Sequence, residues 1–112
     1  MKIRTDFVTN SSSSSFIIAK NNDCKIDEIT EKLQEFRKEI KNTLIDFDMD
    51  SDKNDIDVFI SELADNLFET PGDLVLGDWK ASAREYSNED EAEDAFIYDY
   101  GYRLSTENFK IG

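Results

Sequence analysis

Apolar residues recur at helical spacing in the first half of the chain. Ile26, Ile29 and Leu33 are followed by Phe36 and Ile40, at intervals of three, four, three and four residues. This spacing places all five side chains on one face of an α-helix. The pattern therefore predicts an amphipathic helix that begins near residue 25 and continues to about residue 47.

Two further helices are predicted later in the chain. Residues 54–69 again carry their large apolar side chains at helical spacing, and Pro71 marks the end of the segment. Residues 89–100 form the third helical pattern, with Ser87 or Asn88 as the expected cap and Asp90 or Glu91 as its capping-box partner. Gly101 follows where a helix commonly ends.

The first twenty residues contain the clearest strand pattern. Residues 16–19 are four consecutive apolar residues, so residues 15–20 are predicted to form a central strand that is buried on both faces. Residues 2–9 alternate weakly between apolar and polar side chains, which favours a half-buried strand. The serine-rich residues 9–14 are interpreted as the loop between these two strands.

Two later segments complete the predicted sheet. Residues 74–86 favour a strand in which Gly77 marks a bulge or the start of a hairpin, and residues 102–111 are interpreted as a last strand. We therefore expect a single domain over residues 1–112 with an α+β fold, in which a small, mainly antiparallel sheet packs against three helices. A mostly helical domain with a small hairpin is the alternative.

The N-terminal stretch also carries a resemblance. Residues 2–10 read KIRTDFVTN, and five serines and then Phe16-Ile17-Ile18 follow. This beginning resembles that of many uncharacterised bacterial proteins, chiefly from Firmicutes, whose remaining sequences differ widely. The resemblance implies a bacterial or phage origin. No activity is attached to the stretch, so the resemblance implies no catalytic residue.

The chain is strongly acidic, with 26 acids, 13 bases and a formal net charge of −13. Such a charge repels nucleic acid and anionic membranes and attracts basic surfaces. It fits either a well-solvated bacterial protein or a surface that binds a basic partner. Cys24 is the single cysteine, so no intrachain disulfide is possible, which suits the reducing cytoplasm. No apolar run approaches the length that spans a membrane.

Several chemistries are disfavoured by composition. The chain contains no histidine, so catalysis of the Ser–His–Asp or Cys–His kind is excluded in its usual form, and zinc binding is not expected. It contains four glycines and no glycine-rich phosphate loop. We therefore predict no cofactor, no catalytic residue and no enzymatic activity.

Alternating aspartates after residue 45 raise the question of calcium. An EF-hand loop places glycine at position 6 and glutamate at position 12. In the better register, which begins at Asp46, Ser51 takes position 6 and Asp57 takes position 12. The glycine is missing, so we assign no metal ligand. A carboxylate-built site for a divalent metal or another ligand remains the alternative function.

Two acidic clusters are the candidate sites for a partner. Residues 46–57 carry six acids and Lys53, or −5, and residues 89–94 together with Asp99 carry six acids, or −6. Proteins bind nucleic-acid phosphates with grooves rich in lysine and arginine, and carboxylates on one face of a small protein can occupy such a groove.

We therefore predict an acidic interaction protein that binds a basic partner surface and no nucleic acid directly. In its most specific form, the prediction is a nucleic-acid mimic that inhibits a nucleic-acid-binding enzyme such as a host defence nuclease. Tyr86, Tyr98 and Tyr100 are the predicted aromatic contact anchors. The predicted partner-binding residues are Asp46, Asp48, Asp50, Asp52, Asp55, Asp57, Glu89, Asp90, Glu91, Glu93, Asp94 and Asp99.

Overall fold

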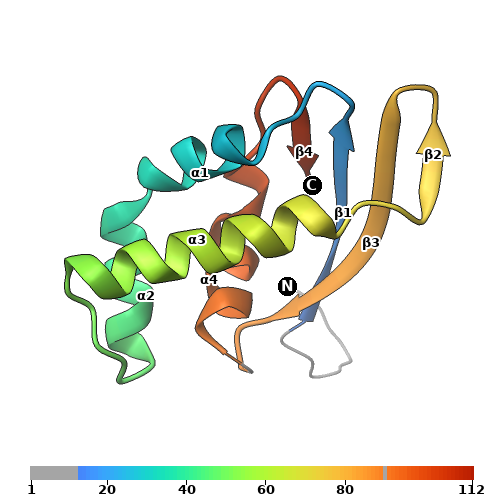
Figure 1. Ribbon diagram of the computed structural model, residues 1–112. Helices are drawn as coiled ribbons and strands as arrows, with labels where there is room; N and C mark the ends of the chain where they lie inside the picture. The colour runs from blue at the N-terminus through green and yellow to red at the C-terminus, as the bar shows by residue number, and fades with distance from the viewer. Residues whose placement is uncertain (1–12, 90) are drawn as a thin grey trace, which may run out of the picture.

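The computed structural model describes residues 13–89 and 91–112. These residues form four α-helices and a four-stranded antiparallel sheet, so the predicted α+β fold is confirmed (Figure 1). The alternative of a mostly helical domain with a small hairpin does not match this sheet. In chain order the elements are β1 (Ser13–Asn21), α1 (Ile26–Gln34), α2 (Arg37–Asp46), α3 (Lys53–Glu69), β2 (Leu74–Leu76), β3 (Trp79–Ser87), α4 (Ala92–Tyr100), the 3-10 helix η1 (Gly101–Arg103) and β4 (Phe109–Ile111).

The strands lie in the order β2-β3-β1-β4, and each neighbouring pair is antiparallel. β1 lies between β3 and β4, which confirms the predicted central strand. It begins at Ser13, so Ser13 and Ser14 belong to the strand and not to the predicted loop; they pair with Ser87 and Tyr86 of β3. The strand predicted for residues 2–9 falls outside the described residues.

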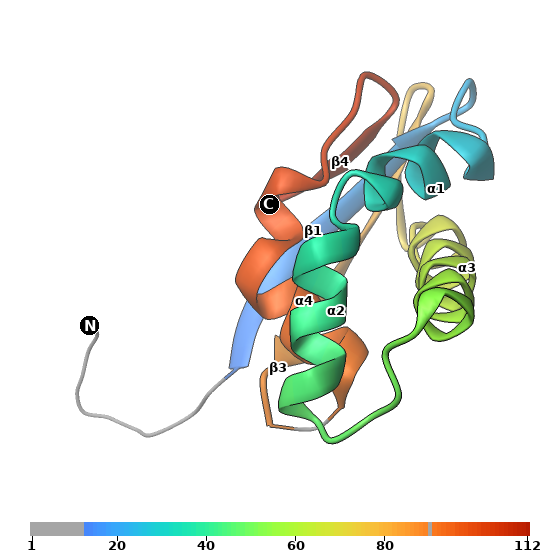
Figure 2. The same cartoon turned by 90° about the vertical axis from the view of Figure 1, so that its left-hand side faces the viewer.

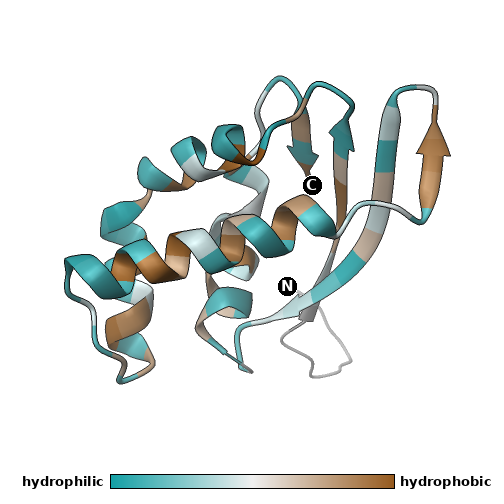
Figure 3. Cartoon of the chain, viewed as in Figure 1, coloured by the Kyte–Doolittle hydropathy of each residue, from teal (hydrophilic) through white to brown (hydrophobic). Residues whose placement is uncertain are grey.

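The two faces of the sheet differ in burial. Phe16 and Ile18 point into the core, whereas Ile17 between them is 54% exposed, so the predicted burial of this strand on both faces is wrong. Neighbouring side chains along a strand point to opposite faces, and the helices gather on only one face of the sheet (Figures 1 and 2). The strand pairing places Leu74 and Leu76 of β2 on the same uncovered face as Ile17. Figure 3 shows β2 as a hydrophobic edge strand.

The later predicted strands are shorter than expected. Gly77, with a φ of 61°, lies in the two-residue turn that joins β2 and β3, so of the two predicted alternatives the hairpin is observed and the bulge is not. At the C-terminal side, η1 continues the chain from α4 as a 3-10 turn. The segment predicted as a strand over residues 102–111 therefore forms β4 only over its last residues.

The first predicted helix is broken in two, so the sheet packs against four α-helices where three were expected. The backbone N–H of Phe36 donates to the carbonyl of Leu33 at 2.9 Å, so the bond reaches back three residues instead of the four of an α-helix. The backbone of Phe36 itself leaves helical geometry. Its ring packs edge-on against Phe96, with 6.1 Å between ring centroids. The change of direction lets α1 pack on α3 while α2 packs on α4.

Helix α4 begins three residues later than predicted, because the chain first makes a turn after β3. Ser87 is the last residue of β3, and its hydroxyl accepts a hydrogen bond from the backbone N–H of Glu89 at 3.1 Å. The N-cap position of α4 is Glu91, so the predicted caps Ser87 and Asn88 are wrong. Within residues 13–89 and 91–112, no helix has the length and apolar character needed to cross a membrane.

Candidate functional site

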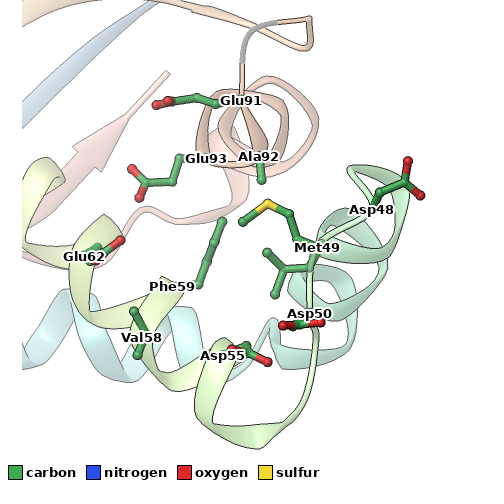
Figure 4. Close-up of a pocket in the computed structure, with 11 residues that line it drawn as sticks. Asp48, Met49, Asp50, Asp55, Val58, Phe59, Glu62, Glu91, Ala92 and Glu93 are labelled. Carbon is green, nitrogen blue, oxygen red and sulfur yellow. The ribbon is translucent and has the colours of Figure 1, made fainter.

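A groove of about 560 Å³ lies between the α2–α3 connection, α3 and the start of α4 (Figure 4). We call it the acidic groove, because its lining combines six carboxylates with apolar side chains and contains no lysine or arginine among the described residues. Its lining residues are Leu44, Asp48, Met49, Asp50, Asp55, Val58, Phe59, Glu62, Glu91, Ala92 and Glu93.

The end of α2 positions the first wall of the groove. Asp48 adopts a left-handed conformation with a φ of 55°. Its backbone N–H donates to the carbonyl of Ile45 at 3.0 Å, and the N–H of Met49 donates to the carbonyl of Leu44 at 2.9 Å. These two bonds form a Schellman motif, which ends a helix and brings the following residue back toward its last turn. The motif therefore directs Met49 toward the groove, where Leu44 also contributes to the lining.

Helix α3 supplies the second wall. Asp55, Val58, Phe59 and Glu62 share one helical face, because residues three or four apart are neighbours on an α-helix. A capping box fixes the start of this face: the carboxylates of Asp52 and Asp55 each accept a hydrogen bond from the other residue's backbone N–H.

The first turn of α4 supplies the third wall, with Glu91 and Glu93 on either side of Ala92. Burial raises the pKa of the Glu93 carboxyl, and the nearby charges of Glu91, Glu62 and Asp94 raise it further. Arg84 opposes this shift. The net effect of burial and of the neighbouring carboxylates is therefore to disfavour the charged form of Glu93.

The acidic groove brings together members of both predicted acidic clusters. One cluster contributes three aspartates from residues 48–55, and the other contributes two glutamates at the start of α4. Five of the twelve predicted residues therefore line it: Asp48, Asp50, Asp55, Glu91 and Glu93.

Other predicted residues lie outside the groove lining. Asp57 on α3 forms an ion pair with Arg37 of α2 at 2.7 Å and a longer one with Lys53 at 3.4 Å. The hydrogen bond from Arg37 lowers the pKa of the Asp57 carboxyl. Asp57 thus links two helices. Asp46, Asp52, Glu89, Asp94 and Asp99 also do not line the groove, and Asp90 falls outside the described residues.

Sequence reasoning missed the sixth carboxylate and the apolar floor. Glu62 lies seven residues after Asp55, so the helical repeat that relates them was readable from the sequence. Met49 and Val58 are 49% and 55% exposed, although both are large apolar residues. Both lie off the predicted apolar stripes, but no signal in the sequence indicated that they meet in one groove.

Two of the three predicted aromatic anchors pack against the core. Tyr86 is only 2% exposed and packs edge-on against Phe16 in the core, with 5.7 Å between ring centroids. Tyr100 packs against Phe96 and Phe36. Neither ring projects as a contact anchor, and Tyr98 does not line the groove.

The metal alternative gains no support from the described part of the chain. In residues 13–89 and 91–112, no three aspartate, glutamate or cysteine side chains form a group that could hold a metal ion. The six groove carboxylates are distributed around an apolar centre, and Figure 4 shows Asp48 directed away from the others.

Comparison of the chain with protein-family models, with curated proteins and with solved structures found no match.

Proposed function

We propose that the protein is an acidic interaction protein that binds a basic surface of a partner protein through the acidic groove. In this proposal it acts by binding, without catalysis and without direct contact with nucleic acid, and it does so in the cytoplasm. The observation that carries the proposal is the joining of two separate acidic segments in one groove whose lining has no base among the described residues.

The physical support is electrostatic. A net charge of −13 steers a basic partner toward the protein and keeps nucleic acid away. The raised pKa of Glu93 indicates that its charged form is disfavoured by burial and by like charges. A lysine or arginine from a partner would relieve that repulsion, which gives the groove a preference for cationic ligands.

The partner class that we propose is a nucleic-acid-binding enzyme, such as a host defence nuclease. Such enzymes bind phosphates through lysine and arginine side chains, and the groove carboxylates would take the place of the phosphates. The protein would then inhibit by occupying the nucleic-acid site.

A pull-down from a bacterial lysate tests this proposal when the captured protein is identified and then challenged with duplex DNA. We expect capture at about 50 mM salt, release at about 500 mM salt, and displacement of the protein by DNA. A captured partner that resists both salt and DNA would contradict the proposed mimicry.

A further inference from the structure

We infer that the occupant of the acidic groove is a basic polypeptide segment that places one apolar side chain between lysine or arginine residues. This inference rests on the proposed function and deepens it, because it defines the partner by more than its charge. A surface that offered only cations would satisfy the carboxylates and leave the apolar floor of the groove in water.

The floor is the first observation. Met49 and Val58 are about half exposed, and Phe59 lies beside them at the base of the groove. In Figure 4 the Met49 side chain extends from the α2–α3 connection toward Ala92, with the Phe59 ring below it. An apolar side chain placed on this floor would remove these groups from water, which is favourable in proportion to the area covered.

The arrangement of charge around the floor is the second observation. Glu62 and Glu93 lie on one side of the Phe59 ring in Figure 4, and Asp50 and Asp55 lie on the other. Cations that flank a central apolar residue would therefore find carboxylates on both sides. Charge complementarity of this kind favours a basic amphipathic segment over a flat cationic surface.

The size of the groove is the third observation. Its volume of about 560 Å³ accommodates a few side chains and not a folded domain.

The floor also has a defined position, because the Schellman motif at Asp48 fixes the backbone of Met49 and the helical spacing of α3 fixes Val58 beside Phe59. The ligand that matches these features is a short segment with one anchor.

Two synthetic peptides of equal lysine and arginine content test the inference, one with a single central leucine and the other with serine in its place. The chain has two methionines, Met1 and Met49, so carbon-13 labelling of their methyl groups gives a resonance within the groove. We expect the leucine peptide to bind at least about tenfold more tightly and to shift the Met49 resonance.

Matched variants locate the effect. Val58→Gln should remove most of the advantage of the leucine peptide, whereas Ile17→Gln, at an equally exposed position on the uncovered face of the sheet, should leave it intact. Both side chains are more than half exposed, so neither change should unfold the protein.

The outcomes separate the two proposals. Salt-sensitive binding of both peptides with equal affinity and an unmoved Met49 resonance would overturn the inference and leave the proposed function standing. Absence of salt-sensitive binding to either peptide would overturn both. A Met49 resonance that shifts with protein concentration alone would assign the groove to a second copy of the chain and would also overturn the inference.

Discussion

The side chain of Asp52 accepts a hydrogen bond from the backbone N–H of Asp55 at 2.9 Å, and the side chain of Asp55 accepts one from the N–H of Asp52 at 3.2 Å. Two residues of one predicted acidic cluster thus hold the start of α3. Asp55 also lines the acidic groove. The two hydrogen bonds between Asp52 and Asp55 therefore fix both the start of α3 and the position of one groove carboxylate.

Replacing Asp52 with alanine should lower the free energy of unfolding measurably, because the backbone N–H of Asp55 then loses its acceptor at the helix N-cap. Asp52→Ser should retain most of the stability, since serine also caps helices well. Chemical denaturation of the three proteins measures the difference. Equal stabilities for the alanine and serine variants would contradict a capping role.

Asp48→Gly should raise the free energy of unfolding by about 0.5–1 kcal/mol, because glycine adopts the left-handed conformation of this residue without steric cost. Asp48→Ala removes the same charge without the freedom of glycine in the left-handed region, and it serves as the control. If thermal unfolding showed equal gains for both variants, relief of charge repulsion and not backbone conformation would be the cause.

The Glu28 carboxylate of α1 accepts hydrogen bonds from the side chain of Thr106 and from the backbone and side-chain N–H groups of Asn108, at 3.1 and 2.9 Å for Asn108. The hydrogen bonds from Thr106 and Asn108 lower the pKa of the Glu28 carboxyl. Glu28 therefore ties α1 to the segment that precedes β4.

A lowered pKa in the folded state means that this stabilisation is complete above the ordinary pKa of glutamate, about 4.3, and is lost as the pH falls through the lower folded value. Glu28→Gln should cost no more than about 1 kcal/mol at pH 7, because solvent screens this partly exposed carboxylate, and progressively less in acid. Denaturation across this pH range measures the effect. Exposed Glu31→Gln on the same helix is the control, and an equal loss there would refute the role of Glu28.

Glu93→Gln should raise stability at neutral pH while weakening the binding of a basic partner. The folded-state pKa of Glu93 is raised, so its ionised form opposes folding above that pKa, and the penalty disappears as the pH falls below the unfolded value. The side chain is only half-buried, so the gain should stay below about 1 kcal/mol. Thermal unfolding at several pH values measures it; destabilisation by this change at pH 7 would contradict the electrostatic description of the groove.

The elements of the fold were largely readable from local pattern. The apolar stripes predicted helical segments with nearly correct outer limits, and the run that ends at Ala19 predicted the central strand. The break after Gln34 was not readable, because Phe36 continues the helical stripe in phase. At the break Phe36 packs against Phe96 and Tyr100 of α4, which are long-range contacts that a local pattern does not contain.

The acidic groove was only partly readable. Charge clustering identified five of its six carboxylates. It could not separate these from Asp57, which belongs to the same cluster but forms an ion pair with Arg37 instead of lining the groove. The packing of α2, α3 and α4 determines whether the two distant acidic segments meet. A local sequence pattern carries no information on this packing. The helical stripe of residues 54–69, by contrast, already places Phe59 inward and leaves Val58 off the buried face, as the structure shows.

The central claim is that the groove, and not the overall charge, binds the basic partner. Two triple variants that each remove three negative charges separate these explanations. The groove variant combines Glu62→Gln, Glu91→Gln and Glu93→Gln, and the control combines Glu31→Gln, Asp65→Asn and Glu107→Gln at exposed positions outside the groove lining.

The decisive measurement is the affinity of both variants and the wild type for the leucine-bearing basic peptide, determined by calorimetry at low salt. We predict that the groove variant binds at least about tenfold more weakly than the wild type, whereas the control changes by less than about twofold. Equal weakening in the two variants would contradict the account, because the net charge of the protein would then explain the binding without the groove.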